Sequence, residues 1–220
     1  MRRRACRARA SHLPFPAVSA SITLAIDTSG PLGGIALGRA GESPMLQRDF
    51  GTGPKAGGEL FVALDETLSA GPRPERIVVG VGPGSYAGVR MAIAAARGLG
   101  LAFGVEPVAL PSVCAYEVHA SAFHAIGDAR RGTFYYSGVQ DRRCVRGPEI
   151  CEEEELRAIL SQHAQWPVLS VEVLPAFPQA WRTTARAVHL ISAPAEEFPR
   201  PLEPIYLREP HITRPRALTT

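Results

Sequence analysis

The residues whose types and spacing point most clearly to chemistry form a glycine-rich turn, GPGS at residues 82–85. It follows an apolar run and precedes a long segment rich in alanine and glycine, which is typical of a strand-to-helix connection. Backbone N–H groups at a helix N-terminus bind anions readily, and Ser85 is a favourable N-cap residue. The turn therefore predicts either a phosphate site or only a tight, capped connection, and the pattern leaves both open.

The same turn also matches the G-x-G-x-x-A pattern of dinucleotide-binding folds. That pattern belongs in a first βαβ unit with an acid at the end of the next strand, whereas Glu106 lies near the start of the next expected strand and not at its end. A Walker-type loop is excluded because no Lys-Ser/Thr pair follows the glycines. An NAD(P) site therefore rests on the glycine pattern alone.

Two aspartates end similar apolar runs, Asp27 in ITLAID and Asp128 in FHAIGD. Each is followed by a turn and a second apolar segment, so each half of the chain is expected to open with a hairpin. We interpret this as an internal duplication of an α/β half. The two carboxylates either hold a Mg²⁺–phosphate between the halves or cap their own hairpins.

The elements that must position these residues follow from the hydrophobic periodicity. In the first half we expect strands at residues 22–27, 34–38, 45–50, 76–81 and 105–110, with helices at 59–68 and 86–103. In the second half we expect strands at 123–128, 133–139 and 167–171, helices at 152–160 and 175–184, and an extended piece at 204–208. This order predicts a duplicated α/β fold of the actin/Hsp70 (ASKHA, ribonuclease H-like) type. Its subdomains are residues 21–110 and 111–220.

Composition narrows the class of protein. The chain has 220 residues, 45% of them hydrophobic, and a net charge of +3. Residues 1–20 contain five arginines and no acid, so the remainder is slightly acidic and is not a basic platform for nucleic acid. We predict that residues 1–20 are a disordered or artefactual extension, although an organelle transit peptide has a similar composition. No apolar run is long enough to span a membrane.

Cysteine and histidine spacing argues against metal and nucleophile chemistry. The four cysteines form no C-x-x-C pair, which favours a reduced, cytoplasmic protein. The six histidines include no H-x-x-x-H pair, and no G-x-S-x-G nucleophile elbow is present. We therefore predict no catalytic residue and no metal.

Four motifs together resemble the TsaB (YeaZ) family of tRNA threonylcarbamoyladenosine (t6A) biosynthesis proteins. They are IDTS, GVGPGSYAGVRMAIAAARGL, IGDARRGTFYYSG and EPIYLRE, in the family's order and spacing over residues 21 to about 214. The resemblance implies a non-catalytic paralogue of the transferase subunit TsaD. It also implies pairing with TsaD, cooperation with the ATPase TsaE and homodimer formation when TsaD is absent.

In that family the complex transfers a threonylcarbamoyl group to the adenosine 3′ of the anticodon in tRNAs that read ANN codons. The resemblance thus implies only indirect contact with tRNA, no membrane, and no cofactor of its own, with ATP or ADP confined to the complex with TsaD and TsaE. The family's first helix commonly carries a histidine where this chain has GGE at residues 57–59. The older glycoprotease label therefore finds no support in this sequence.

The resemblance places the partner interface on the two helices of the first half. Gly88, Gly98 and Gly100 interrupt the second of these helices, and close approach of another helix is one reason for them. The predicted interface residues are Leu60, Leu64, Leu68, Val89, Arg90, Ile93 and Arg97.

Arg90 either orders the turn at residues 82–85 or pairs across the interface, and Arg130 and Arg131 are candidates for neutralising a phosphate. The candidate residues for weak nucleotide or phosphate binding are Asp27, Thr28, Ser29, Gly82, Gly84, Ser85 and Asp128. The alternative function is an ATPase or kinase relative of the same fold that acts alone.

Overall fold

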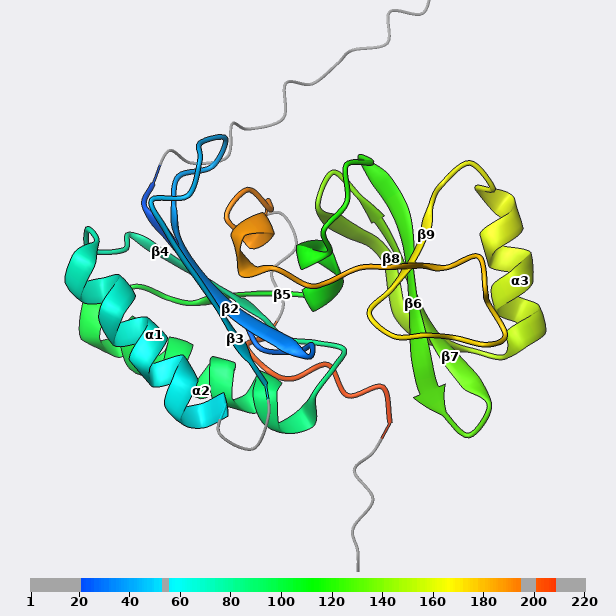
Figure 1. The fold of residues 1–220 in the computed structure, drawn as a ribbon, viewed down its shortest axis with the longest axis horizontal. Helices are drawn as coiled ribbons and strands as arrows, with labels where there is room; N and C mark the ends of the chain where they lie inside the picture. The colour runs from blue at the N-terminus through cyan, green and yellow to red at the C-terminus, as the bar shows by residue number, and fades with distance from the viewer. Residues whose placement is uncertain (1–20, 53–55, 195–200, 209–220) are drawn as a thin grey trace, which may run out of the picture.

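The computed structural model describes residues 21–52, 56–194 and 201–208, which form two lobes that lie side by side (Figure 1). The predicted extension at residues 1–20 lies outside the described residues. The first lobe contains β1 (Thr23–Asp27), β2 (Leu32–Gly38), β3 (Leu46–Gly51), α1 (Ala56–Ala70), β4 (Arg76–Gly80), α2 (Tyr86–Phe103) and β5 (Val108–Leu110). The 3₁₀ turn η1 (Ser112–Ala115) leads to the second lobe. The second lobe contains β6 (Ala122–Arg130), β7 (Thr133–Gln140), β8 (Arg143–Cys151), α3 (Glu153–Gln162), β9 (Val168–Ser170) and β10 (Trp181–Arg182).

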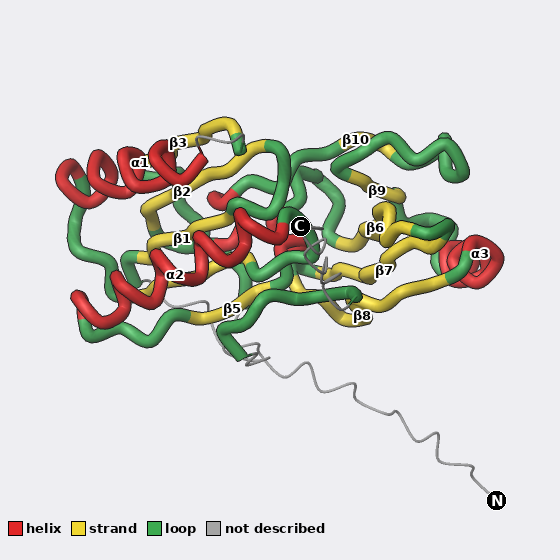
Figure 2. The backbone as a smooth tube through the Cα atoms, turned by 90° about the horizontal axis from the view of Figure 1, so that it is seen from below, coloured by secondary structure: helices red, strands yellow, loops and turns green. Residues whose placement is uncertain are grey.

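The first sheet has the strand order β3-β2-β1-β4-β5. The first hairpin, β1 with β2, is antiparallel, whereas β4 pairs in parallel with both β1 and β5. β1 and β4 are buried along their whole length, as continuous apolar strands require when both faces of a sheet are covered. Helices α1 and α2 lie side by side over one face of this sheet (Figure 2).

The second sheet repeats this plan strand for strand, with the order β10-β9-β6-β7-β8. β6 corresponds to β1: it forms an antiparallel hairpin with β7 and a parallel pair with β9. Helix α3 takes the place of α1, but residues 171–180 form turns where α2 would be. The predicted duplicated α/β fold is confirmed.

Two expectations for the second half are wrong. The helix expected at residues 175–184 is replaced by turns and the short strand β10, because Pro175 and Pro178 both lack the N–H that a helix needs. Strand β8 was not expected, since its sequence carries several polar residues without a clean alternation. β8 lies at the edge of the second sheet and is half-exposed. Its side chains therefore need not alternate between apolar and polar, which is the pattern that predicts a strand.

The far face of the first sheet is covered by a segment from the end of the chain. The 3₁₀ turn η2 (Ala187–Leu190) packs there beside Ile191 and Ala193. The guanidinium of Arg76, on β4, donates to the carbonyls of both Ile191 and Ala193, at 3.3 and 3.1 Å. Residues 187–193 therefore pack on the first sheet, although the sequence analysis assigned them to the second subdomain.

Two of the three helical glycines of α2 are required by close neighbours, and the third is not. A Cβ on Gly88 would lie 2.1 Å from the Thr28 carbonyl oxygen, and one on Gly100 would lie 2.7 Å from that of Val105. A Cβ on Gly98 would meet nothing within 4 Å. The close neighbours of Gly88 and Gly100 are therefore loops of the same lobe and not another helix.

We expect Gly88→Ala and Gly98→Ala to change stability in opposite directions. Alanine at Gly88 must displace the backbone at Thr28, so it should lower the free energy of unfolding by about 2 kcal/mol or more. Alanine at Gly98 should raise it by about 0.5–1 kcal/mol, the usual gain in helix propensity. Urea denaturation of both variants measures this, and equal effects would contradict the contact assigned to Gly88.

Candidate functional site

The residues that could bind a ligand meet in a cleft between the lobes, with a volume of about 530 Å³. The first lobe contributes the turn after β1 and the GPGS turn before α2. The second lobe contributes the end of β6 and the segment after β9. All of these segments follow the carboxyl ends of strands, where ligands of α/β sheets usually bind.

On the first-lobe wall, hydrogen bonds fasten the GPGS turn to the end of β1. The Ser85 N–H donates to the Ser29 carbonyl at 2.7 Å, and the Thr28 hydroxyl donates to the Gly88 carbonyl at 2.6 Å. Ser85 is the N-cap of α2, since its hydroxyl accepts from the Gly88 N–H at 3.2 Å. The N–H groups of Ser85 and Gly88 thus already have acceptors within the chain and are not free to bind an anion. The turn is therefore a capped strand-to-helix connection.

Asp27 lies behind this wall and not in the cleft. Its side chain is buried, and its Oδ1 accepts from the N–H and the hydroxyl of Ser29 at 2.9 and 2.7 Å. Burial raises the pKa of this carboxyl above its ordinary value. Asp27 therefore caps its own hairpin, one of the two interpretations left open by the sequence.

The seven candidate residues for nucleotide or phosphate binding therefore divide into two groups. Ser29, Gly84, Ser85 and Asp128 line the cleft. Asp27, Thr28 and Gly82 are buried and are not among its lining residues. Both groups lie at or just after the ends of β1, β4 and β6, and the sequence could not tell which of their side chains point into the cleft.

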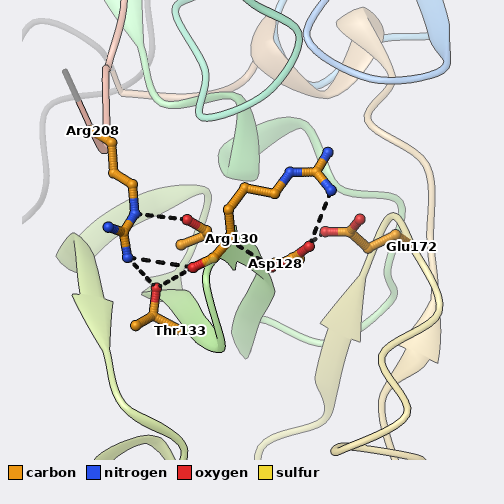
Figure 3. Close-up of polar contacts among 6 residues, drawn as sticks. Asp128, Arg130, Thr133, Glu172 and Arg208 are labelled. Atoms are coloured by element: carbon orange, nitrogen blue, oxygen red, sulfur yellow. Dashed lines mark hydrogen bonds and ion pairs between the residues drawn. The ribbon is translucent and has the colours of Figure 1, made fainter. Parts of the chain in front are cut away.

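On the second-lobe wall, Asp128 is held by its neighbours (Figure 3). Its Oδ1 accepts from the Arg130 N–H at 2.7 Å, and its Oδ2 pairs with the Arg130 guanidinium at 3.3 Å. The Asp128 N–H in turn donates to Glu172 Oε1 at 2.7 Å. Two carboxylates thus face the cleft beside one arginine that is already paired, a balance that disfavours an added phosphate. Arg131 is exposed and is not among the cleft residues.

Among the cleft residues that the sequence analysis did not propose are Tyr116, Tyr135 and Glu172. Tyr116 and Tyr135 join their hydroxyls at 2.8 Å, and burial raises the pKa of both, that of Tyr135 to about 12. Tyr135 belongs to the quoted motif DARRGTFY and was thus within reach of sequence analysis. Tyr116 and Glu172 carry no motif, and only the sheet topology brings them to the cleft.

The predicted interface residues on α1 and α2 need correction. Leu60, Leu64, Val89 and Ile93 are at most 5% exposed and pack in the core beneath the first sheet, and Leu68 is half-buried against the same core. The regular apolar spacing that marked them is the face that the helices bury against their own sheet.

The outer face of the two helices carries other apolar side chains. Phe61 and Val62 on α1 are 57% and 59% exposed, and Leu101 on α2 is 87% exposed. We refer to these three residues, with the exposed Arg90 and Arg97, as the outer helix face. Large apolar side chains that stay exposed on two neighbouring helices (Figure 2) make this face a candidate interaction surface.

Of the two predicted interface arginines, neither orders the GPGS turn directly. Arg90 donates to the Tyr86 hydroxyl at 2.6 Å and lies over that ring, 5.1 Å from its centroid. Arg97 donates to the Leu202 carbonyl at 2.9 Å. Both remain exposed on α2, so the structure leaves them accessible.

Within residues 21–52, 56–194 and 201–208, no group of three or more His, Cys, Asp or Glu side chains is placed to hold a metal ion. In the same part of the chain, no helix is both long and apolar enough to cross a membrane.

Comparison with known proteins then places the fold. The family model described as TsaD, tRNA N6-adenosine threonylcarbamoyltransferase, matches residues 62–149. The structure of YeaZ from Pseudomonas aeruginosa is 24% identical with a TM-score of 0.50, and the match covers 60% of this chain and 66% of that one. No curated protein matches the chain significantly in sequence.

A second structure, of an uncharacterized protein with similarity to peptidase YeaZ from Pseudomonas aeruginosa, is 22% identical with a TM-score of 0.57. That match covers 86% of this chain and all of the other. These two likenesses show that the chain has the fold of YeaZ. The fold is the duplicated ASKHA-like fold that the sequence predicts.

The TsaD model matches only one continuous part of this chain, which has a YeaZ-like fold. Residues 62–149 run from α1 through most of β8, and thus include the GPGS turn and Asp128. They stop before Glu172 and before residues 187–193, which pack on the first sheet. The TsaD-like part of the chain is therefore α1 to β8, and the later segments are outside it.

The buried carboxyl of Asp27 predicts a pH-dependent effect. Because its pKa is raised by folding, the folded chain holds the Asp27 proton more tightly than the unfolded chain, and stability falls as the pH rises above the unfolded value near 4. Asp27→Asn cannot titrate, so its free energy of unfolding minus that of the parent should increase with pH above about 4 and level off beyond the folded pKa. Denaturant titrations at several pH values measure this difference.

Asp65→Asn, on the exposed side of α1, is the matched control and should give a nearly constant difference. A constant difference for Asp27→Asn as well would show that this carboxyl is not buried as described.

Proposed function

We propose that this protein is a non-catalytic subunit of the cytoplasmic t6A synthesis complex, in which it binds TsaD and supports threonylcarbamoyl transfer to tRNA. The four sequence motifs, the likeness to YeaZ and the match to the TsaD model support this proposal. The observation that carries it is the outer helix face, which presents large apolar side chains on a lobe whose own core is already complete.

TsaD, as a relative with the same helix pair, is a suitable partner for that face. Two such helix pairs packed face to face would form a four-helix bundle, which buries Phe61, Val62 and Leu101 from water. Burial of one such side chain contributes about 1.5–3 kcal/mol, so three of them are enough to decide affinity. A second copy of this chain offers the same face, and we therefore propose a homodimer when TsaD is absent.

The cleft supports a binding role in the complex more than catalysis by the isolated chain. Asp128 and Glu172 repel phosphates, and the start of α2 has committed two of its N–H groups. ATP or ADP would then be bound only with TsaD and TsaE, and tRNA would be reached only through the complex. The alternative is an ATPase or kinase relative acting alone, which the position of the cleft between two hairpins favours.

We expect the full chain and the TsaD of its own source to elute together in size exclusion with light scattering. Phe61→Glu or Leu101→Glu should weaken this complex at least about tenfold, because each buries a charge without a partner in an apolar contact. Val173→Glu, at a 71% exposed residue of the second lobe, is the matched control and should bind like the parent.

Retained affinity in both outer-face variants would exclude this face as the docking surface. Absence of a complex at micromolar concentration, with or without ATP, would contradict the proposal itself. Steady ATP turnover by the isolated chain would instead support the alternative function.

A further inference from the structure

Three of the motifs found in the sequence meet at one short segment, residues 201–208, which we call the strap. It contains EPIYLR, and it contacts both the GVGPGSY segment of the first lobe and the DARRGT turn of the second. In Figure 1 the strap is the orange-red segment that runs from the first lobe toward the space between the lobes. The function proposed above does not use these contacts.

The first lobe holds the strap at three points. The Ile205 N–H donates to the Val81 carbonyl at 2.8 Å, just before the GPGS turn. The ring of Tyr206 stacks on that of Tyr86, with 5.1 Å between centroids, at the first residue of α2. Arg97 donates to the Leu202 carbonyl, and the side chains of Leu202 and Ile205 pack on the core of this lobe.

The second lobe holds the strap through Arg208 (Figure 3). Its Nε–H donates to the Ala129 carbonyl at 2.8 Å, and its terminal nitrogen donates to the Thr133 hydroxyl at 2.6 Å and the Arg130 carbonyl at 3.4 Å. These acceptors lie at the end of β6 and the start of β7, on either side of the turn that joins the two strands. The Arg208 guanidinium therefore binds both sides of the turn that follows Asp128, a residue of the cleft.

That turn holds two residues in an unfavourable backbone conformation. Arg130 and Arg131 both have positive φ, 69° and 59°, a conformation that residues other than glycine adopt at a cost of about 1–3 kcal/mol. Hydrogen bonds from a charged donor are among the stronger ones in proteins, and Arg208 supplies them to this turn's carbonyl groups. The strap thus stabilises a strained turn of one lobe while it is anchored to the other.

We propose that the strap is an interlobe clamp and that Arg208 is the positioning residue that sets the width of the cleft. A cavity of about 200 Å³ lies under it, lined by residues of both lobes that include Pro83, Ala129 and Ile205. Leu207 packs on the core that the two lobes share. Release of Arg208 frees the second lobe to move away from the start of α2. The inference concerns the isolated chain and stands apart from the choice of partner.

The test uses the full chain with Arg208→Ala, and Arg182→Ala as the matched control. Arg182 is an exposed arginine that donates to the Val171 carbonyl within its own lobe. In Arg208→Ala, amide hydrogen exchange should become about tenfold faster at residues 129–133 of the second lobe. It should also become about tenfold faster at the Ile205 amide, which is bonded to Val81 of the first lobe. Spin labels on non-natural residues at positions 65 and 154 should give a broader interlobe distance distribution.

Tyr206→Ala tests the same clamp from its other anchor and keeps the proposal testable if Arg208→Ala does not fold. It should broaden the same distance distribution, whereas Arg182→Ala should leave exchange and distance unchanged. Faster exchange confined to residues 129–133, with an unchanged distance, would mean that Arg208 only braces its turn and would overturn the clamp. Unchanged exchange and distance in both strap variants would overturn it as well.

Discussion

The close contact between Gly88 and the end of β1 is the constraint on which the rest of the structure depends. Because Gly88 has no side chain, the Thr28 backbone approaches α2 closely, and the Thr28 hydroxyl reaches the Gly88 carbonyl. This contact fixes where α2 begins and holds Ser85 at the edge of the cleft. It also sets which side of α2 faces the sheet, and hence which side chains of α2 remain exposed.

The two lobes share one plan but use it differently. In the first lobe the aspartate that ends the opening strand is buried and caps its hairpin, whereas its counterpart Asp128 faces the cleft beside Glu172. The second lobe also replaces the helix that would correspond to α2 with turns. The first lobe thus retains both helices and the outer helix face, and the second provides most of the charge in the cleft.

The helix pair has two apolar faces with different roles. The regular stripe through Leu60, Leu64 and Ile93 completes the core of the first lobe, while Phe61, Val62 and Leu101 lie outside that stripe and face water. A helix whose inner face is satisfied by its own sheet can offer the outer face to another chain without loss of its own core. Under the function proposed above, this separation would let the chain fold alone and still bind a partner.

The sequence by itself determined the duplicated plan, the strands and helices of the first half, the tight GPGS turn and the family resemblance. These depend on local periodicity and on residues close together in the chain, such as Ser85 with the start of α2. Only the tertiary structure decided which apolar residues stay exposed, because an amphipathic stripe marks the buried face and says nothing of the other. It likewise decided that Glu172, Tyr116 and Arg208 meet the hairpin at Asp128, since their contacts join residues far apart in the chain and depend on how the two sheets pack.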